Sequence, residues 1–157
     1  MKKQIAIYLA LFALLLPAIL VKASIPISPR KFDEFKDINC EDEMARLDNF
    51  AVNLQQLPAD KGVIIFYGGR RIGGRLPRRG DAAARAARLK TYLTQRRSIP
   101  TQRVIVIDGG YREDWMAELW ILPSVAVTLP APTPSVPADK IRFRKGTARA
   151  RDFRCQI

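Results

Sequence analysis

The chain has 157 residues, of which 48% are hydrophobic, and it contains no histidine. Without an imidazole there is no Ser/His/Asp or Cys/His nucleophile pair, no histidine metal site, and no side chain whose ordinary pKa lies near neutrality. The sequence also has no glycine-rich phosphate-binding motif of the G-x-G-x-x-G or Gly-Lys-Ser/Thr type. We therefore predict one globular domain that is not an enzyme and has no catalytic residue, metal or cofactor.

The first 23 residues are expected to form a secretory signal peptide. Lys2 and Lys3 precede an apolar run from residue 5 to residue 21, and the small residues that a signal peptidase reads stand at its end. An uncleaved membrane anchor is the alternative, although Pro17 interrupts a run that is short for a spanning helix. Cleavage would leave an exported protein, periplasmic or secreted, without a membrane span.

Only two cysteines are present, Cys40 and Cys155, near the two ends of the mature chain. An exported protein meets an oxidising compartment, where an even pair of cysteines is expected to form a disulfide. A disulfide that closes such a long loop would stabilise the fold by about 4–5 kcal/mol in the loop-entropy description. The pair has no C-x-x-C spacing, and two cysteines without histidine cannot complete a zinc site. We therefore predict a structural bridge.

The net charge of +12 is unevenly distributed along the chain. Segment 24–60 carries 4 basic and 8 acidic residues, and segment 61–103 carries 12 and 1. Segment 104–123 carries 1 and 4, and segment 124–157 carries 7 and 2. A positive field concentrated in the middle of the chain, with a basic tail, indicates an anionic partner.

Hydrophobic periodicity predicts the order strand, helix, strand, helix, strand, strand. The expected elements are strand 31–35, a helix between the cap Asn39 and Pro58, strand 63–67, a helix capped by Asp81 and continuous to Arg97, strand 104–107 and strand 117–122. Gly68-Gly69 and Asp108-Gly109-Gly110 are expected to end their strands, and the last two strands to form a hairpin. The predicted fold is α+β, a small mixed sheet with two helices packed on one face.

Composition divides the mature chain into three parts. The α+β domain is expected over 24–123, and five prolines within residues 123–137 make 124–138 an extended linker with little core of its own. Residues 139–157 form a basic tail, which the predicted disulfide would fold back over the domain.

Aromatic and acidic residues near the last strands have structural interpretations. Trp120 is expected in the sheet core and Trp115 over the hairpin turn. Glu113, Asp114 and Glu118 are expected to form a salt-bridged rim, because one hairpin seldom supplies both carboxylates of a glycosidase.

The second predicted helix reads Arg85-Ala86-x-x-Leu89-x-x-Tyr92-Leu93 and leads through Ile99 and Arg103 into strand 104–107. This resembles the R-A-x-x-V-x-x-Y-L helix and following strand of the OmpA-like C-terminal domain, the peptidoglycan-associating module of Gram-negative envelopes. Leu47-Asp48-x-x-Ala51-x-x-Leu54 is similar to the first helix of that family, and 64–68 to its second strand. The resemblance covers 31–122 and implies an OmpA-like β-α-β-α-β-β fold.

In that family an Asp after the second strand and an Arg on the second helix clamp the diaminopimelate unit of peptidoglycan. Arg85 matches the Arg, so the resemblance implies a ligand contact there. The position of the Asp falls in Gly68-Gly69-Arg70, which has no carboxylate. The resemblance therefore implies peptidoglycan binding with an altered ligand preference, in a divergent member that lacks the motif Asp.

Two functions and a structural interpretation remain open. The first is an OmpA-like cell-envelope module that contacts peptidoglycan. The second is a binder of anionic polymers such as lipopolysaccharide or another envelope glycan, because Arg forks bind phosphate and carboxylate bidentately; nucleic acid ranks lower, since aromatic residues for base stacking are not interleaved with the charges. The third is that the arginines are a solvated surface of a structural protein. The candidate ligand-binding residues are Arg70, Arg71, Arg75, Arg78, Arg79, Arg85 and Arg88.

Overall fold

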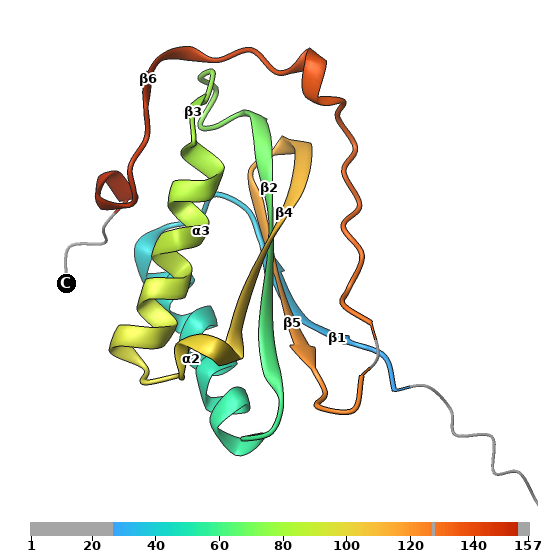
Figure 1. Cartoon of the computed structure of the whole chain (residues 1–157). Coiled ribbons are helices and arrows are strands. Elements are labelled where there is room, and N and C mark those ends of the chain that lie inside the picture. Colours follow the sequence, from blue (N-terminus) through green and yellow to red (C-terminus); the bar gives the residue numbers. More distant parts are fainter. Residues whose placement is uncertain (1–26, 127, 154–157) are drawn as a thin grey trace, which may run out of the picture.

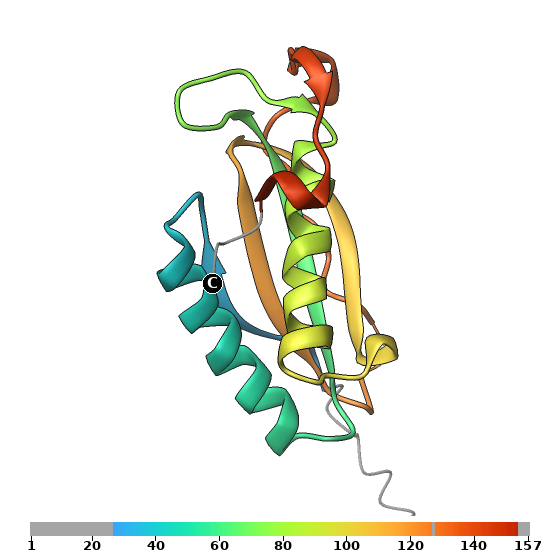
Figure 2. The same ribbon diagram turned by 90° about the vertical axis from the view of Figure 1, so that its left-hand side faces the viewer.

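A computed structural model of the protein describes residues 27–126 and 128–153 (Figure 1). Four strands form a mixed sheet in the order β1 (Arg30–Phe35), β5 (Met116–Leu122), β2 (Lys61–Arg71), β4 (Val104–Asp114). β2 and β4 are parallel, and β5 is antiparallel to both β1 and β2. Helices α2 (Cys40–Gln56) and α3 (Asp81–Thr91) cover one face of the sheet (Figure 2). The predicted α+β class, with a mixed sheet and two helices, is confirmed.

Helix α2 begins where the sequence indicates. The Asn39 side chain accepts a hydrogen bond from the Asp42 amide at 2.8 Å, and the first turn carries three acidic residues. These carboxylates stabilise the positive end of the helix dipole. Leu47, Ala51 and Leu54 are buried on one face, as the periodicity predicts.

Helix α3 differs from the prediction at both ends. Gly80 is the N-cap, with φ 78°, a conformation that favours glycine, and Asp81 is the first helical residue. The helix also does not continue in α geometry to Arg97, because residues Tyr92–Arg96 form a π-helical turn. The Arg97 amide donates to the Tyr92 carbonyl at 3.3 Å, and this wider turn lets both side chains bind Asp48 on α2.

The glycines expected to end strands β2 and β4 lie inside them instead. The predicted hairpin is also wrong, because β2 lies between β4 and β5. The short connection from β4 to β5 passes directly against Gly69, where a Cβ atom would overlap the backbone of Asp114 and Trp115. Gly109 likewise leaves room for the Tyr67 ring. These glycines allow close approach of neighbouring chain and need not mark turns.

The main core lies between the sheet and the helices and includes Trp115, which is 1% exposed. Trp120 lies on the opposite face of the sheet and is half-buried. Trp115 is therefore a core residue and does not cover a hairpin turn, and Trp120 packs on the smaller apolar cluster of the other face. Trp115 follows β4 directly, and the chain turns its side chain inward beneath the helices, where it packs on Phe35 with ring centroids 6.0 Å apart.

The opposite face of the sheet is covered by the proline-rich segment (Figure 1). Val136 is buried and bridges to Tyr111 of β4, and the Thr133 amide donates to the Tyr67 hydroxyl at 3.1 Å. The segment predicted as a linker is thus extended, and it packs on the sheet.

The remaining elements are short. They are β3 (Arg78–Arg79), β6 (Arg144–Thr147) and the 3-10 turns Thr101–Arg103, Ala138–Lys140 and Ala150–Phe153. Within the described ranges no helix is long and apolar enough to cross a membrane. The predicted signal peptide and Cys155 lie outside those ranges, so the cleavage and the disulfide stay predictions.

Candidate anion-binding site

The basic tail pairs with the arginine-rich loop at one end of the molecule. Strands β3 and β6 are parallel, with Arg78 opposite Arg144 and Arg79 opposite Thr147. The Arg144 amide donates to the Pro77 carbonyl at 2.9 Å, and the Ala148 amide donates to the Arg79 carbonyl at 3.0 Å. Two segments about 65 residues apart in the chain therefore lie side by side.

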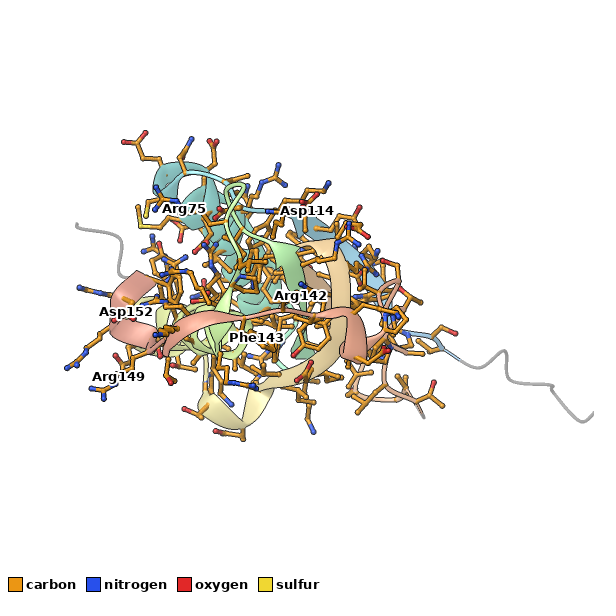
Figure 3. All side chains as sticks on the ribbon, turned by 90° about the horizontal axis from the view of Figure 1, so that it is seen from above. Arg75, Asp114, Arg142, Phe143, Arg149 and Asp152 are labelled. Atoms are coloured by element: carbon orange, nitrogen blue, oxygen red, sulfur yellow. The ribbon has the colours of Figure 1, made fainter. Side chains whose placement is uncertain are left out.

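We call the result the basic end, made of the cationic side chains of segments 70–79 and 142–151. Figure 3 views it from above, with Arg75 from the loop and Arg142 and Arg149 from the tail. Its members are Arg70, Arg71, Arg75, Arg78, Arg79, Arg142, Arg144, Lys145, Arg149 and Arg151. The two positive blocks of the sequence thus form one surface, which concentrates their field.

Two hollows open at this end. The smaller, about 320 Å³, is lined by both charge signs: Asp37, Arg75, Arg78, Asp81, Arg85 and Arg144, with Phe153. The larger, about 630 Å³, is lined by Arg79 and by residues 141–147 of the tail, which include Ile141, Arg142, Phe143, Arg144 and Lys145. No carboxylate of the described residues lines the larger hollow.

Arg85 lies at the wall of the smaller hollow with its side chain 15% exposed. It donates to Asp37 at 2.5 Å, and its guanidinium carbon lies 5.1 Å from the Trp115 ring centroid and 4.8 Å from that of Phe153. Asp37 follows β1, so a carboxylate does face Arg85, from a different place in the chain than the family motif. Phe153 of the tail covers the same guanidinium.

The other predicted residues divide into two groups. Arg70 pairs with Glu113 at 3.0 Å, Arg78 pairs with Asp152 at 2.9 Å, and Arg88 pairs with the buried Glu43 of α2. Burial lowers the pKa of Arg88, and its side chain lines neither hollow. Arg78 and Arg88 link separate elements of the fold, whereas the Arg70–Glu113 pair lies exposed on the surface.

Arg71, Arg75 and Arg79 have no ion pair with a described carboxylate. Arg71 donates to the Gly74 carbonyl at 3.2 Å, and the Arg79 guanidinium lies over the Phe143 ring, 4.9 Å from its centroid. Arg75 is exposed at the wall of the smaller hollow. These side chains keep donors available for a ligand.

Five neighbours of the loop arginines were not predicted from the sequence: Asp37, Phe153 and the tail residues Arg142, Arg144 and Lys145. The alternation Arg142-Phe143-Arg144 was an available signal, because alternating side chains are typical of a strand. No local pattern identifies the strand with which it pairs.

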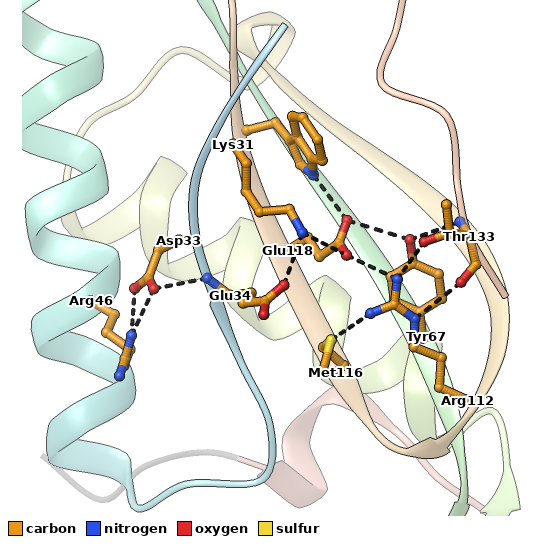
Figure 4. Close-up of polar contacts among 10 residues, drawn as sticks. Lys31, Asp33, Glu34, Arg46, Tyr67, Arg112, Met116, Glu118 and Thr133 are labelled. Carbon is orange, nitrogen blue, oxygen red and sulfur yellow. Dashed lines mark hydrogen bonds and ion pairs between the residues drawn. The ribbon is translucent and has the colours of Figure 1, made fainter. Parts of the chain in front are cut away.

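A second polar cluster lies on the other face of the sheet (Figure 4). Glu118, 2% exposed, accepts hydrogen bonds from Lys31 at 3.1 Å, Arg112 at 2.9 Å and Trp120 at 3.1 Å. Burial alone would raise the pKa of Glu118, but hydrogen bonds from Lys31, Trp120 and Arg112 hold it below its ordinary value. The prediction of an exposed, salt-bridged rim therefore holds for Glu113 and Asp114, whose ion pairs are on the surface, whereas the ion pairs of Glu118 involve a buried carboxylate. This cluster joins β1, β4 and β5, and both oxygens of its carboxylate accept from donors of the fold.

The described residues contain no group of three or more Cys, Asp or Glu side chains that could hold a metal ion. No protein-family model matches the chain, and no curated protein matches it in sequence. A function for this chain therefore has to be argued from the arrangement of the basic end.

Proposed function

We propose that the protein is an exported, non-catalytic cell-envelope module that binds anionic envelope polymers through the basic end, with peptidoglycan the first polymer to test. The observation that carries the proposal is the β3–β6 pairing, which gathers cations from both basic segments around two hollows. Arg75, Arg142 and Lys145 form no ion pair with a described carboxylate and are exposed. Such groups bind a polyanion without first breaking an internal pair.

The experiment is sedimentation of the protein with purified peptidoglycan at low and high salt. We expect the double variant Arg75→Gln/Arg142→Gln to lower the bound fraction and to flatten its salt dependence, because it removes two cations from the basic end. The matched control is Lys61→Gln/Arg96→Gln, which removes the same charge from exposed positions away from both hollows. Equal loss in the two variants would contradict a localised site, and no pull-down at low salt would refute peptidoglycan as the partner.

Asp37 supports an OmpA-like variant of this proposal. Asp37 supplies a carboxylate 2.5 Å from Arg85 at a hollow of about 320 Å³. A cation and an anion at one hollow suit a ligand that carries both an ammonium and a carboxylate, such as the end of diaminopimelate.

Two kinds of peptidoglycan separate this variant from binding by charge alone. Capture of diaminopimelate predicts pull-down with diaminopimelate-type sacculi, little with lysine-type sacculi, and loss in Asp37→Asn. Binding by charge alone predicts similar pull-down of both types, and a small gain in Asp37→Asn because a negative charge is removed.

A further inference from the structure

The larger hollow at the basic end differs from the smaller one in its charge. Its four cationic side chains come from β3 and from segment 142–145, and no carboxylate of the described residues lines it. The smaller hollow contains Asp37 and Asp81, which neutralise part of its positive charge. A multiply charged anion is therefore attracted more strongly to the larger hollow than to the smaller one.

Contacts with the fold hold Arg79 and Arg144 in place and leave hydrogen-bond donors of both guanidinium groups available. The Arg79 guanidinium stacks on Phe143, and Phe143 contacts Tyr111 of β4 with ring centroids 6.5 Å apart. Arg144 uses its Nε to bind the Leu76 carbonyl at 3.0 Å, which leaves its two terminal nitrogens as donors. Stacking and a single backbone bond reduce the side-chain entropy that ligand binding would cost.

We infer that this hollow binds phosphate monoester groups of a phosphorylated glycan, a site that rests on the proposed function and specifies its ligand class. A phosphate monoester carries about −1.5 to −2 charges and three acceptor oxygens, whereas a carboxylate carries one charge and two oxygens. Several guanidinium forks around one space satisfy the phosphate, and a single carboxylate would leave most of their donors unused.

The size and lining of the hollow favour a sugar phosphate over free phosphate. A volume of about 630 Å³ exceeds that of one phosphate several-fold and lies in the range of ordinary ligand pockets. Phe143 and Ile141 line it beside the cations, so a sugar ring has an apolar surface next to the anionic group.

The test compares two soluble glycan polyanions matched in total charge, dextran phosphate and polygalacturonate, by titration calorimetry with the full chain. Dextran phosphate is the probe for phosphate monoesters, and polygalacturonate is the probe for carboxylates. We expect tighter binding of dextran phosphate, and a larger loss of that binding in Arg142→Gln/Lys145→Gln than in Arg71→Gln/Arg75→Gln. The second pair removes the same charge from the loop and lines no part of the larger hollow.

A third probe identifies the source of the phosphate. Vesicles that carry a phosphate monoester lipid are compared with the soluble phosphorylated core glycan of lipopolysaccharide. Binding of the soluble glycan that is lost in Arg142→Gln/Lys145→Gln supports the inference, and binding to vesicles alone overturns it in favour of a membrane surface.

The outcomes also distinguish the inference from the proposed function. Equal affinity for the two polyanions, with equal losses in the two double variants, overturns the phosphate site and leaves binding of anionic polymers intact. No binding of either polyanion or of peptidoglycan at low salt overturns both.

Discussion

At the scale of single residues, Glu118 shows how the chain accommodates a buried charge. Its carboxylate lies among four donors on the face of the sheet that the proline-rich segment covers (Figure 4). A carboxylate held among cationic donors stabilises the fold only while it is ionised. This gives the stability of the protein a defined dependence on pH.

We predict that stability falls in acid partly through Glu118. The folded-state pKa of Glu118 lies below its ordinary value, so its contribution is complete above an unfolded pKa of about 4.3 and is lost as the pH falls through the folded value. Glu118→Gln should lower the unfolding free energy at neutral pH by about 1–3 kcal/mol, and should lose less stability on acidification than the parent. Urea unfolding at neutral pH and at about pH 3.5 measures both effects.

Glu113→Gln is the matched control, because Glu113 pairs with Arg70 on the surface with its side chain 64% exposed. It should leave the acid dependence of stability unchanged. If Glu118→Gln and Glu113→Gln follow the same pH profile as the parent, the buried carboxylate does not contribute in the way described.

At the scale of elements, the sequence predicts well what depends on neighbouring residues. Asn39 caps α2 as predicted, and the stripe Leu47, Ala51, Leu54 is buried, because cap and periodicity are local properties. The prediction that strands end at Gly68 and Gly109 was wrong. A glycine in a sequence does not reveal whether it forms a turn or lets another part of the chain pack closely against the backbone. That distinction depends on chain far away in the sequence.

The candidate site shows the same division. The loop arginines could be identified from their local density, and Arg85 from its position on the helix. Asp37, Phe153 and the tail cations come from three other segments, and only the packing of β6 on β3 and of the last turn on α3 brings them together. Pairing between distant segments has no signal in a single sequence.

The tail element gives the next prediction. Asp152 anchors the last 3-10 turn, because it pairs with Arg78 at 2.9 Å and accepts from the Arg149 amide at 3.2 Å. The Arg149 amide and Arg78 hold the pKa of Asp152 below its ordinary value, so the anchor is ionised at neutral pH. Asp152→Asn should loosen the tail and speed hydrogen exchange at the Arg144 and Ala148 amides by roughly two- to fivefold.

Asp139→Asn is the control for this experiment. Asp139 lies in the same tail, but its ion pair is with its neighbour Lys140 at 3.8 Å and both side chains are exposed. Exchange at amides inside β2 should not change in either variant. Similar exchange at Arg144 and Ala148 in the two variants would mean that Asp152 does not anchor the tail.

At the scale of the whole molecule, the segment just before Cys40 and the last described residue, Phe153, meet at Arg85. This residue donates to Asp37, three positions before Cys40, and stacks on Phe153, two positions before Cys155. Such proximity of flanking residues supports the predicted Cys40–Cys155 bridge. The bridge would fix the tail over α3 and so keep the two positive blocks of the sequence together.

The last prediction concerns this bridge. If it forms, neither cysteine of the protein isolated from an oxidising compartment is labelled by a thiol reagent in denaturant until a reductant is added. Reduction should lower the unfolding free energy by up to about 4–5 kcal/mol, because a loop of more than 100 residues is released in the unfolded chain. The unfolding free energy of Cys40→Ser/Cys155→Ser should equal that of the reduced parent and should not change when a reductant is added.

Reduction should also weaken anionic-polymer binding, since a tail held by non-covalent contacts alone leaves β3 more often. Labelling before reduction would refute the bridge, and unchanged polymer binding after reduction would show that β6 stays paired without it.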